Sequence, residues 1–422
     1  MQEKDISKAD FEQCQKCSIC LSVCPMHEVN PLYPGPKQAG PDWERYRMKN
    51  KEYFDYSLKY CLGCRRCETA CPSGVKIADL IVRAKLELGS GAASRLASPV
   101  KSLRDMTLAS TDSMGSIASV LAPIANPILA SKPAKAALSL AGIHSKRTFP
   151  KYSAQKFEDW FNSSEAPSQE GFGHYITYFH GCYVGYNYPS LGKDTVALLN
   201  ACGVGVRLLK GEKCCGVALL SNGFGTRAGK NARHNVLKMR EALLFGSEAV
   251  LTSSSSCTLM MREEYPHLLD VDNSAIREKL QLVTRYLYER VSSGQIRLAF
   301  KEGLKGSIAY HTACHMQRLG WQPYSIGLLK MIPGLDLKVL EQQCCGIAGT
   351  FGFKKENYAF TQAIGSKLFD SIRQSGAGAV ATDCETCKWQ IEMSTGLKVY
   401  NPIEILANAM DLEETARLNA KP

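Results

Sequence analysis

Eight cysteines near the N-terminus follow one spacing twice. Each run reads CxxCxxCxxxCP, and the second run begins 47 residues after the first. Two intervening residues let a tight turn aim consecutive sulfurs at adjacent irons, and the closing proline keeps the chain from folding back over them. This spacing is typical of paired [4Fe-4S] clusters, in which the fourth cysteine of each run ligates the other cluster. The runs are Cys14, Cys17, Cys20, Cys24 and Pro25, then Cys61, Cys64, Cys67, Cys71 and Pro72.

The crossover predicts two ligand sets, and two other interpretations fit the pattern less well. Structural zinc sites usually pair two CxxC units and have no use for a third cysteine followed by Cys-Pro. Disulfides require an exported chain, and the N-terminal MQEKDISKAD has no apolar segment of a secretion signal. We therefore expect a reducing, cytoplasmic compartment and two cubane clusters. The predicted sets are Cys14, Cys17, Cys20 with Cys71, and Cys61, Cys64, Cys67 with Cys24.

Nine further cysteines form a second duplication in the C-terminal half. Each repeat contains Cys-Cys-Gly, and another cysteine stands 42 positions after the second cysteine of that tripeptide. Cysteines at the ends of strands and the starts of helices converge at one edge of an α/β sheet. Five thiolates are too many for a tetrahedral zinc ion, so the second repeat predicts a multinuclear iron–sulfur centre. Its ligands would be Cys314, Cys344, Cys345, Cys384 and Cys387.

The first repeat has only four of these cysteines, because Ser254 occupies the position of Cys384. A serine hydroxyl is a harder and less acidic ligand than a thiolate, so an identical centre is not expected. Three outcomes stay open: an ordinary four-cysteine cluster, a zinc site, or a structural copy without metal. The four candidate ligands are Cys182, Cys214, Cys215 and Cys257. Cys202, with no partner at motif spacing, is expected to be a buried packing residue.

Three histidines lie beside these cysteines. His311 and His315 flank Cys314, and His180 precedes the first cysteine of the earlier repeat. An imidazole could deliver protons to a quinone reduced beside the five-cysteine centre. Equally, a histidine at a strand end can serve only as a hydrogen-bond partner of a ligand. A GxGxxA sequence at 223–228 is discounted as a dinucleotide site, because the strand before it is weak and no acidic residue stands at the ribose distance.

Length and composition suit a globular protein of two or three domains. The chain has 422 residues, of which 45% are hydrophobic and 22% charged, and a formal net charge of +11. Residues 76–160 supply +6 of that charge, from twelve Lys or Arg and six Asp or Glu. Such a surplus favours an anionic membrane surface or an acidic partner, or it only solvates a linker. Little aromatic interleaving accompanies the basic residues, so no nucleic-acid partner is expected.

The basic region is a linker at 89–170, rich in Ala, Ser, Gly and Pro. Short amphipathic helices are expected at 116–121 and 135–140, which suits a helix lying on a membrane or on a partner. It suits equally a strap across the protein's own core. Two prolines interrupt the least polar segment, 113–131, so no transmembrane helix is expected. The basic residues beside the apolar patches are Lys132, Lys135, Lys146 and Arg147.

The remaining pattern indicates the elements that position these residues. Apolar residues recur at helical spacing over 77–88, which favours a helical N-terminal domain. From Tyr175 onward, short apolar runs alternate with helical stretches, as in α/β domains with largely parallel sheets. Strands are expected at 175–179, 206–210 and 249–253, and helices at 190–201, 226–244, 324–331 and 356–373. The fold class is therefore α+β multidomain, with a helical double-[4Fe-4S] ferredoxin domain at 1–88, the linker at 89–170, and α/β repeats at 171–300 and 301–422.

Long strings of the sequence resemble a known family, the C subunits of anaerobic glycerol-3-phosphate dehydrogenases. A ferredoxin domain followed by two CCG domains also resembles the B subunits of heterodisulfide reductases and the iron–sulfur subunits of glycolate oxidases. The strings that carry the first resemblance are NPLYPGPKQAGPD at 30–42, YCLGCRRCETACPSGVKI at 60–77, FHGCYVGYNYPSLGKD at 179–194, CCGIAGTFGFKKENY at 344–358 and TDCETCKWQIEMST at 382–395.

The resemblance implies an electron-transfer subunit that does not itself oxidise the substrate. Such a subunit carries electrons from flavoprotein catalytic subunits A and B to membrane (mena)quinone during anaerobic growth. It lies peripherally on the cytoplasmic side of the inner membrane and helps to anchor the catalytic dimer. The resemblance further implies a non-cubane [4Fe-4S] cluster in the second CCG domain, whereas Ser254 puts a matching first cluster in doubt. An iron–sulfur subunit of a glycolate or lactate oxidase, or of a heterodisulfide-reductase-type enzyme, is the alternative.

Overall fold

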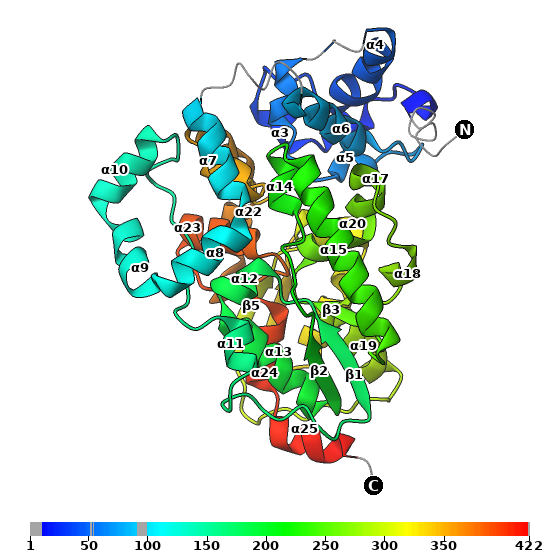
Figure 1. Ribbon diagram of the computed structural model, residues 1–422, viewed down its shortest axis with the longest axis vertical. Helices are drawn as coiled ribbons and strands as arrows, with labels where there is room; N and C mark the ends of the chain where they lie inside the picture. The colour runs from blue at the N-terminus through cyan, green and yellow to red at the C-terminus, as the bar shows by residue number, and fades with distance from the viewer. Residues whose placement is uncertain (1–10, 51–52, 54, 91–98, 421–422) are drawn as a thin grey trace.

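The structure is a computed structural model that describes residues 11–50, 53, 55–90 and 99–420 (Figure 1). A helical N-terminal domain lies at one end, and two α/β domains form the rest of the body (Figure 1). The α+β fold class is therefore confirmed. The stretch MQEKDISKAD, on which the expected lack of an export signal depends, lies outside the described residues.

The N-terminal domain is helical in all of its described regular structure, as the sequence predicts. Its longest helix, α6 (Ile77–Ser90), buries Ile77, Leu80, Ile81 and Ala84, which are at most 5% exposed. These positions form one face at helical spacing, and that face packs into the core beside both cysteine runs. The shorter elements are η2 (Phe11–Gln13), α2 (Ile19–Ser22), α3 (Pro25–Val29), η3 (Gln38–Asp42), α4 (Trp43–Lys49), η4 (Tyr56–Tyr60) and α5 (Arg66–Thr69).

The linker folds into a helical strap, defined here as residues 99–147. Figure 1 shows α9 and α10 standing out from the body, whereas α7 and α8 lie against it. In α8, Gly115 lies so close to Tyr186 that an added Cβ would be 2.3 Å from the ring. Arg104 of α7 pairs with Glu356 at 2.9 Å, which ties the strap to the second α/β domain. The strap helices are α7 (Pro99–Ala109), α8 (Thr111–Val120), α9 (Ala122–Ala130) and α10 (Lys132–Leu140), and α11 (Phe157–Phe161) follows.

Among the described helices, none by itself is long and apolar enough to cross a membrane. Helices α8 and α9 reach that length and composition only together, and they bend by 107° at the break between them. Pro123 stands in the first turn of α9 and Pro127 inside it.

One basic residue of the strap contradicts the expectation that it lies beside the apolar surface patches. Lys132 and Lys146 are exposed, but Arg147 is only 3% exposed. The turn before it pairs Ile143 with Lys354 in an antiparallel bridge. This bridge brings the chain back onto the second α/β domain, and the Arg147 side chain enters that domain. The prediction is therefore wrong for Arg147, because a long-range contact fixes its direction.

The two α/β domains repeat one topology, as the duplicated sequence predicts. Each contains a four-stranded, wholly parallel sheet, with strand orders β2-β1-β3-β4 and β6-β5-β7-β8. The strands β1 and β5 are central and hydrogen-bond to two neighbours, so their carboxyl ends meet those of β2, β3, β6 and β7 at matching edges. The strands are β1 (His174–Tyr178), β2 (Val204–Leu208), β3 (Val250–Thr252), β4 (Leu280–Leu282), β5 (Gly306–Tyr310), β6 (Leu335–Val339), β7 (Ala379–Ala381) and β8 (Val399–Tyr400).

Helices connect these strands, and the expected ones are present at nearly the expected positions. In the first domain they are α12 (Gly181–Tyr186), α13 (Pro189–Ala201), α14 (Val217–Ser221), α15 (Gly225–Leu244), α16 (Ser255–Leu259), η6 (Met260–Glu264), α17 (Tyr265–Leu269), α18 (Ser274–Arg277) and α19 (Val283–Ser292). In the second they are α20 (Cys314–Leu319), α21 (Gln322–Lys330), η7 (Gly349–Phe353), η8 (Lys355–Asn357), α22 (Tyr358–Ser375), α23 (Glu385–Thr395), α24 (Pro402–Ala409) and α25 (Leu412–Asn419). Helix α14 precedes the GxGxxA sequence, so no strand leads into it.

Shared cores join the domains. Ile176 of β1 and Tyr310 of β5 belong to one buried cluster, so the two sheets are packed as a single unit. The core of the N-terminal domain likewise includes Cys344 and Ile364 of the second α/β domain. Cys202 is 4% exposed in the first of these clusters, and burial raises the pKa of its thiol to about 12, as expected of a packing residue.

Candidate metal centres

The first ferredoxin set is brought together around two unusual turns. The thiols of Cys14, Cys71 and Cys17 all act on Cys20, whose pKa is raised to about 11 by burial and then by these neighbours. Lys16 and Ser18 have φ angles of 58° and 65°, and Gly63 and Arg65 of the second run have φ angles of 66° and 61°. A non-glycine residue in this left-handed region costs about 1–2 kcal/mol. Both runs therefore hold the same costly turn between their cysteines.

The second ferredoxin set encloses a hollow. Burial and then Cys64 raise the pKa of Cys24 to about 12, and Cys61 also acts on it. Lys85 donates a hydrogen bond of 2.6 Å to the carbonyl oxygen of Cys61, which fixes the start of the run. The hollow has an empty volume of about 350 Å³, and its lining includes Cys24, Cys61, Cys64 and Cys67. Thiols that converge on a hollow fit an iron–sulfur cluster.

The five cysteines of the second CCG domain meet at the carboxyl edge of its sheet. Cys314 begins α20 after β5, the Cys344–Cys345 pair follows β6, and Cys384 precedes α23 after β7. The sulfurs of Cys345 and Cys387 are 3.2 Å apart. Gly346 has a φ of 86°, and a Cβ there would lie 2.1 Å from the carbonyl oxygen of Thr361. The glycine of the motif therefore lets its loop lie directly on α22.

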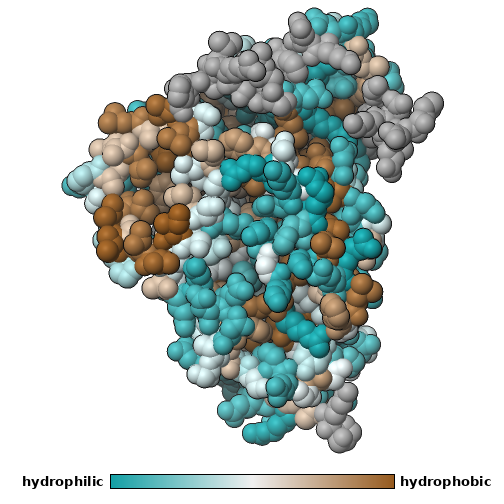
Figure 2. Space-filling model, in the orientation of Figure 1, coloured by the Kyte–Doolittle hydropathy of each residue, from teal (hydrophilic) through white to brown (hydrophobic). Residues whose placement is uncertain are grey.

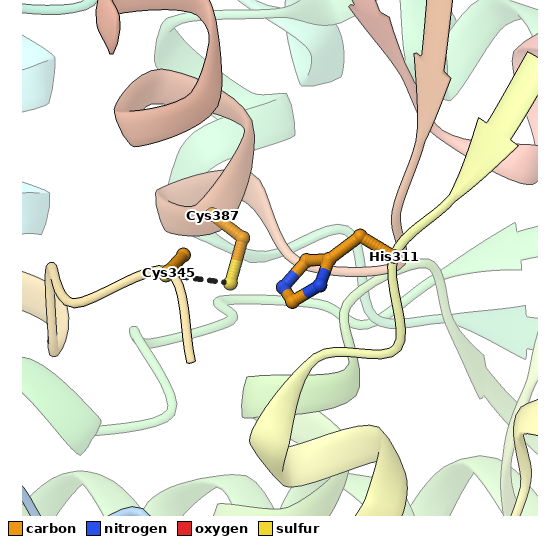
Figure 3. Close-up of side chains that lie close together, drawn as sticks. All are labelled: His311, Cys345 and Cys387. Carbon is orange, nitrogen blue, oxygen red and sulfur yellow. Dashed lines mark hydrogen bonds between the residues drawn. The ribbon is translucent and has the colours of Figure 1, made fainter. Parts of the chain in front are cut away.

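His311 points toward the Cys345–Cys387 pair (Figure 3). One ring nitrogen and the two sulfurs lie within 4.8 Å of one another, and neither ring nitrogen has a hydrogen-bond partner among the described residues. Burial and then Arg66 lower its pKa to about 4, so the ring is neutral at pH 7. His311 is thus placed to act on the sulfurs. Its role as a proton donor to quinone stays a prediction.

His315 lies at the boundary of the two repeats instead. Its Nδ1 is 3.0 Å from the hydroxyl of Ser256, and that hydroxyl is 3.6 Å from the sulfur of Cys384. Burial lowers the pKa of His315 to about 4 as well. A residue of the first repeat thus contacts the ligand set of the second, which the cysteine spacing did not indicate.

The first CCG domain gathers its four cysteines, and Ser254 has another role. The sulfurs of Cys182 and Cys214 are 3.9 Å apart, and the thiol of Cys215 hydrogen-bonds with both Cys214 and Cys257. The hydroxyl of Ser254 caps α16 by accepting from the amide of Cys257 at 3.3 Å. It also donates to the Glu385 carboxylate at 2.9 Å. Four thiols fit an ordinary cluster or zinc, and the serine is engaged in a cap.

Replacing Ser254 by alanine should therefore cost stability and leave metal content unchanged. Loss of the cap removes about 1 kcal/mol of folding free energy. Thermal melting and iron and zinc analysis of anaerobic protein measure both effects, with Ser221→Ala, a surface change near the same domain, as the control. A loss of metal with an unchanged melting temperature would instead make Ser254 a ligand.

The second ferredoxin set touches the second CCG set. The thiol of Cys314 hydrogen-bonds to the sulfur of Cys64, and this bond is the main reason that the pKa of Cys64 falls to about 7. Cys314 also hydrogen-bonds with Cys344. Arg66, two residues after Cys64, donates to the carbonyl oxygen of Gln342 at 3.4 Å. The two ligand sets are therefore in direct contact across the domain boundary.

Comparisons with known proteins agree with this arrangement. The family model described as "4Fe-4S dicluster domain" matches residues 10–75, and the one described as "Cysteine-rich domain" matches 176–262 and 308–392. The C subunit of the anaerobic glycerol-3-phosphate dehydrogenase of Escherichia coli is 49% identical over 96% of this chain and 100% of its own length. An uncharacterized iron–sulfur protein of Methanocaldococcus jannaschii is 24% identical over 98% of this chain and 73% of its own. A lactate utilization protein A of Bacillus cereus is 30% identical over 44% of this chain and 77% of its own.

Proposed function

Because the chain belongs to the family of anaerobic glycerol-3-phosphate dehydrogenase C subunits, we propose that it passes electrons from flavoprotein subunits to membrane quinone. It is an iron–sulfur subunit, and the partners named A and B in the family would supply the electrons. The clusters, when bound, supply one-electron carriers at each cysteine set. The alternative, an iron–sulfur subunit for lactate or glycolate oxidation, is favoured by a similarity that covers only 44% of the chain.

The contact between Cys64 and Cys314 is the observation that carries this proposal. It joins the ligand set of the N-terminal domain to that of the second CCG domain, and Cys344 packs in the same core. Electrons entering at the first ferredoxin set therefore have a continuous route of ligand residues to the second CCG set. The first CCG set lies outside this route. Quinone reduction is proposed beside the second CCG set.

The test uses the anaerobically purified complex with its flavoprotein subunits. Glycerol-3-phosphate-dependent reduction of a menaquinone analogue should require this chain, and the chain should hold at least about eight irons with EPR signals of two cubane clusters. Flavoprotein subunits that reduce the analogue equally fast without this chain would overturn the proposal. Fewer than about eight irons per chain would also overturn it.

We further propose that the outer face of the strap attaches the complex peripherally to the cytoplasmic side of the inner membrane. Figure 2 shows apolar surface gathered over α8, α9 and α10. Val120, Ile124 and Leu140 are 73%, 63% and 88% exposed. Lys132 and Lys146 are exposed nearby, as suits an anionic bilayer. The opposite side of α7 and α8 packs on the body, so the strap covers the protein's own core and also presents an apolar face.

Replacing Val120 and Ile124 together by glutamate should weaken binding to vesicles of phosphatidylglycerol and phosphatidylethanolamine at least about tenfold. Burying one such side chain contributes about 1.5–3 kcal/mol, and 1.4 kcal/mol corresponds to a factor of ten. Vesicle flotation measures the bound fraction. The matched control is Leu244→Glu, an equally exposed apolar residue at the end of α15. Equal binding of both variants and the unchanged chain would contradict attachment through this face.

A further inference from the structure

Arg147 differs from the other buried arginines of the protein. Each of the others forms an ion pair: Arg47 with Glu44, Arg65 with three carboxylates, Arg104 with Glu356, and Arg262 with Glu278. Arg147 is 3% exposed and forms no ion pair within the described part of the chain. An isolated buried charge is costly unless an opposite charge lies near it. The site of Arg147 therefore requires an anion.

The side chains that hold the Arg147 guanidinium are all neutral. It donates to the hydroxyl of Thr361 at 2.6 Å and to the side-chain oxygen of Gln390. The ring of Tyr358 lies beneath it, 4.8 Å from its central carbon. Its Nε is buried and has no hydrogen-bond partner among the described residues. These contacts orient the guanidinium, but none of them neutralises its charge.

The guanidinium lies directly behind the second CCG set. Thr361 is the residue on which Gly346 of the motif packs, and Gln390 lies one helical turn after Cys387 on α23. Burial lowers the pKa of Arg147 to about 10, while the thiols and phenols around it, Cys345 among them, act in the opposite direction. The cysteines of this set are therefore the anions nearest to hand when they are deprotonated.

The strap gives the first CCG set the opposite charge. The carboxylate of Asp112, at the start of α8, accepts a hydrogen bond of 2.8 Å from the amide of Cys214. Thr111 beside it hydrogen-bonds to the sulfur of Cys214. One segment of the chain thus places a carboxyl group at one set and a guanidinium at the other. A fixed positive charge favours the addition of an electron nearby, and a negative charge disfavours it.

We propose that Arg147 is the buried counter-cation of the iron–sulfur centre held by the second CCG domain, and that its charge raises the reduction potential of that centre. Five thiolates carry more negative charge than the four of each ferredoxin set, so the requirement for a cation is greatest there. The inference rests on the proposed iron–sulfur centre in this domain. It does not depend on quinone as the electron acceptor.

The test is a dithionite titration of the anaerobic holoprotein followed by EPR. Arg147→Gln should shift the signal of the second CCG centre to a more negative potential. We expect at least a tenfold change in its one-electron reduction equilibrium, which is 59 mV. The two ferredoxin signals should stay where they are. Arg147→Lys, which keeps the charge, should remain close to the unchanged protein.

Controls separate charge from packing. Arg104→Gln removes another buried arginine of the strap, one that is paired with Glu356, and should leave the potential unshifted. If Arg147→Gln loses the centre while Arg147→Lys keeps it, the charge is required and the inference stands. Loss of the centre in both variants, or an unshifted potential in Arg147→Gln, overturns it. Iron analysis of the unchanged protein is done first, since the absence of a third centre there would refute the proposed cofactor and not the role of Arg147.

Discussion

Replacing Cys314 by serine should reduce glycerol-3-phosphate-dependent quinone reduction to the level measured without this chain. Cys314 is a ligand candidate of the second CCG set and also the residue that contacts Cys64, so its sulfur serves both the centre and the junction. Iron content should fall by about four atoms per chain, the content of one [4Fe-4S] centre. The measurement is the quinone assay on the anaerobic complex, together with iron analysis and EPR.

The matched control is Cys202→Ser, the same substitution at a buried thiol. Cys202 packs in the core shared by the two sheets, apart from the four cysteine sets. It should keep its activity and iron with only a modest loss of stability. The proposed route would be contradicted by a Cys314→Ser complex that still reduces quinone at the rate of the Cys202→Ser complex.

Replacing Arg65 by methionine should have the largest effect on stability, a loss of about 3–5 kcal/mol. Arg65 is 1% exposed and faces Glu68 and Glu264 at 3.0 Å and Asp79 at 2.6 Å. Two of these carboxyls belong to the N-terminal domain and one to the first CCG domain. Without the guanidinium, three buried carboxyls would face one another across the domain boundary. Denaturant unfolding of the anaerobic protein measures the loss.

The loss at Arg65 should also depend on pH. Burial raises the pKa values of Glu68 and Glu264 even with Arg65 present, and its removal raises them further. A carboxyl whose folded pKa lies above its unfolded value favours folding at low pH, and that advantage disappears as pH rises toward the folded pKa. The Arg65→Met protein should therefore recover stability between pH 8 and about pH 5. Arg45→Met, at a half-buried arginine paired with Asp42, should cost about 1 kcal/mol or less and show no such recovery. Equal losses at both arginines would contradict this account.

The features that the sequence predicts are those set by local geometry. The spacing of Cys14, Cys17 and Cys20 is a property of one turn, so the crossover with Cys71 could be expected from the spacing alone, and the fold brings these thiols together. The expected strand at 175–179 and helix at 226–244 appear as β1 and α15, because apolar periodicity is read over a few residues. The identity of the bound metals remains a prediction from the donor atoms.

The features that the sequence does not predict depend on contacts between distant residues. The role of Ser254 as a cap that donates to Glu385 joins positions 131 residues apart. The direction of Arg147 depends on Thr361 and Gln390, and the contact of Cys64 with Cys314 on the packing of two domains. No local pattern encodes these distances. A basic residue in a linker rich in alanine and proline looks the same whether it faces solvent or a buried centre.

The core that the N-terminal domain shares with Cys344 and Ile364 has a consequence for how the protein is made. A ribosome completes the first cysteine-rich domain about 260 residues before it reaches those partners, a delay of roughly 13–50 s at bacterial elongation rates. Throughout that interval the nascent domain lacks part of its apolar lining. Iron loaded early would enter a half-closed cage, so stable maturation of the N-terminal clusters is expected to follow release of the finished polypeptide.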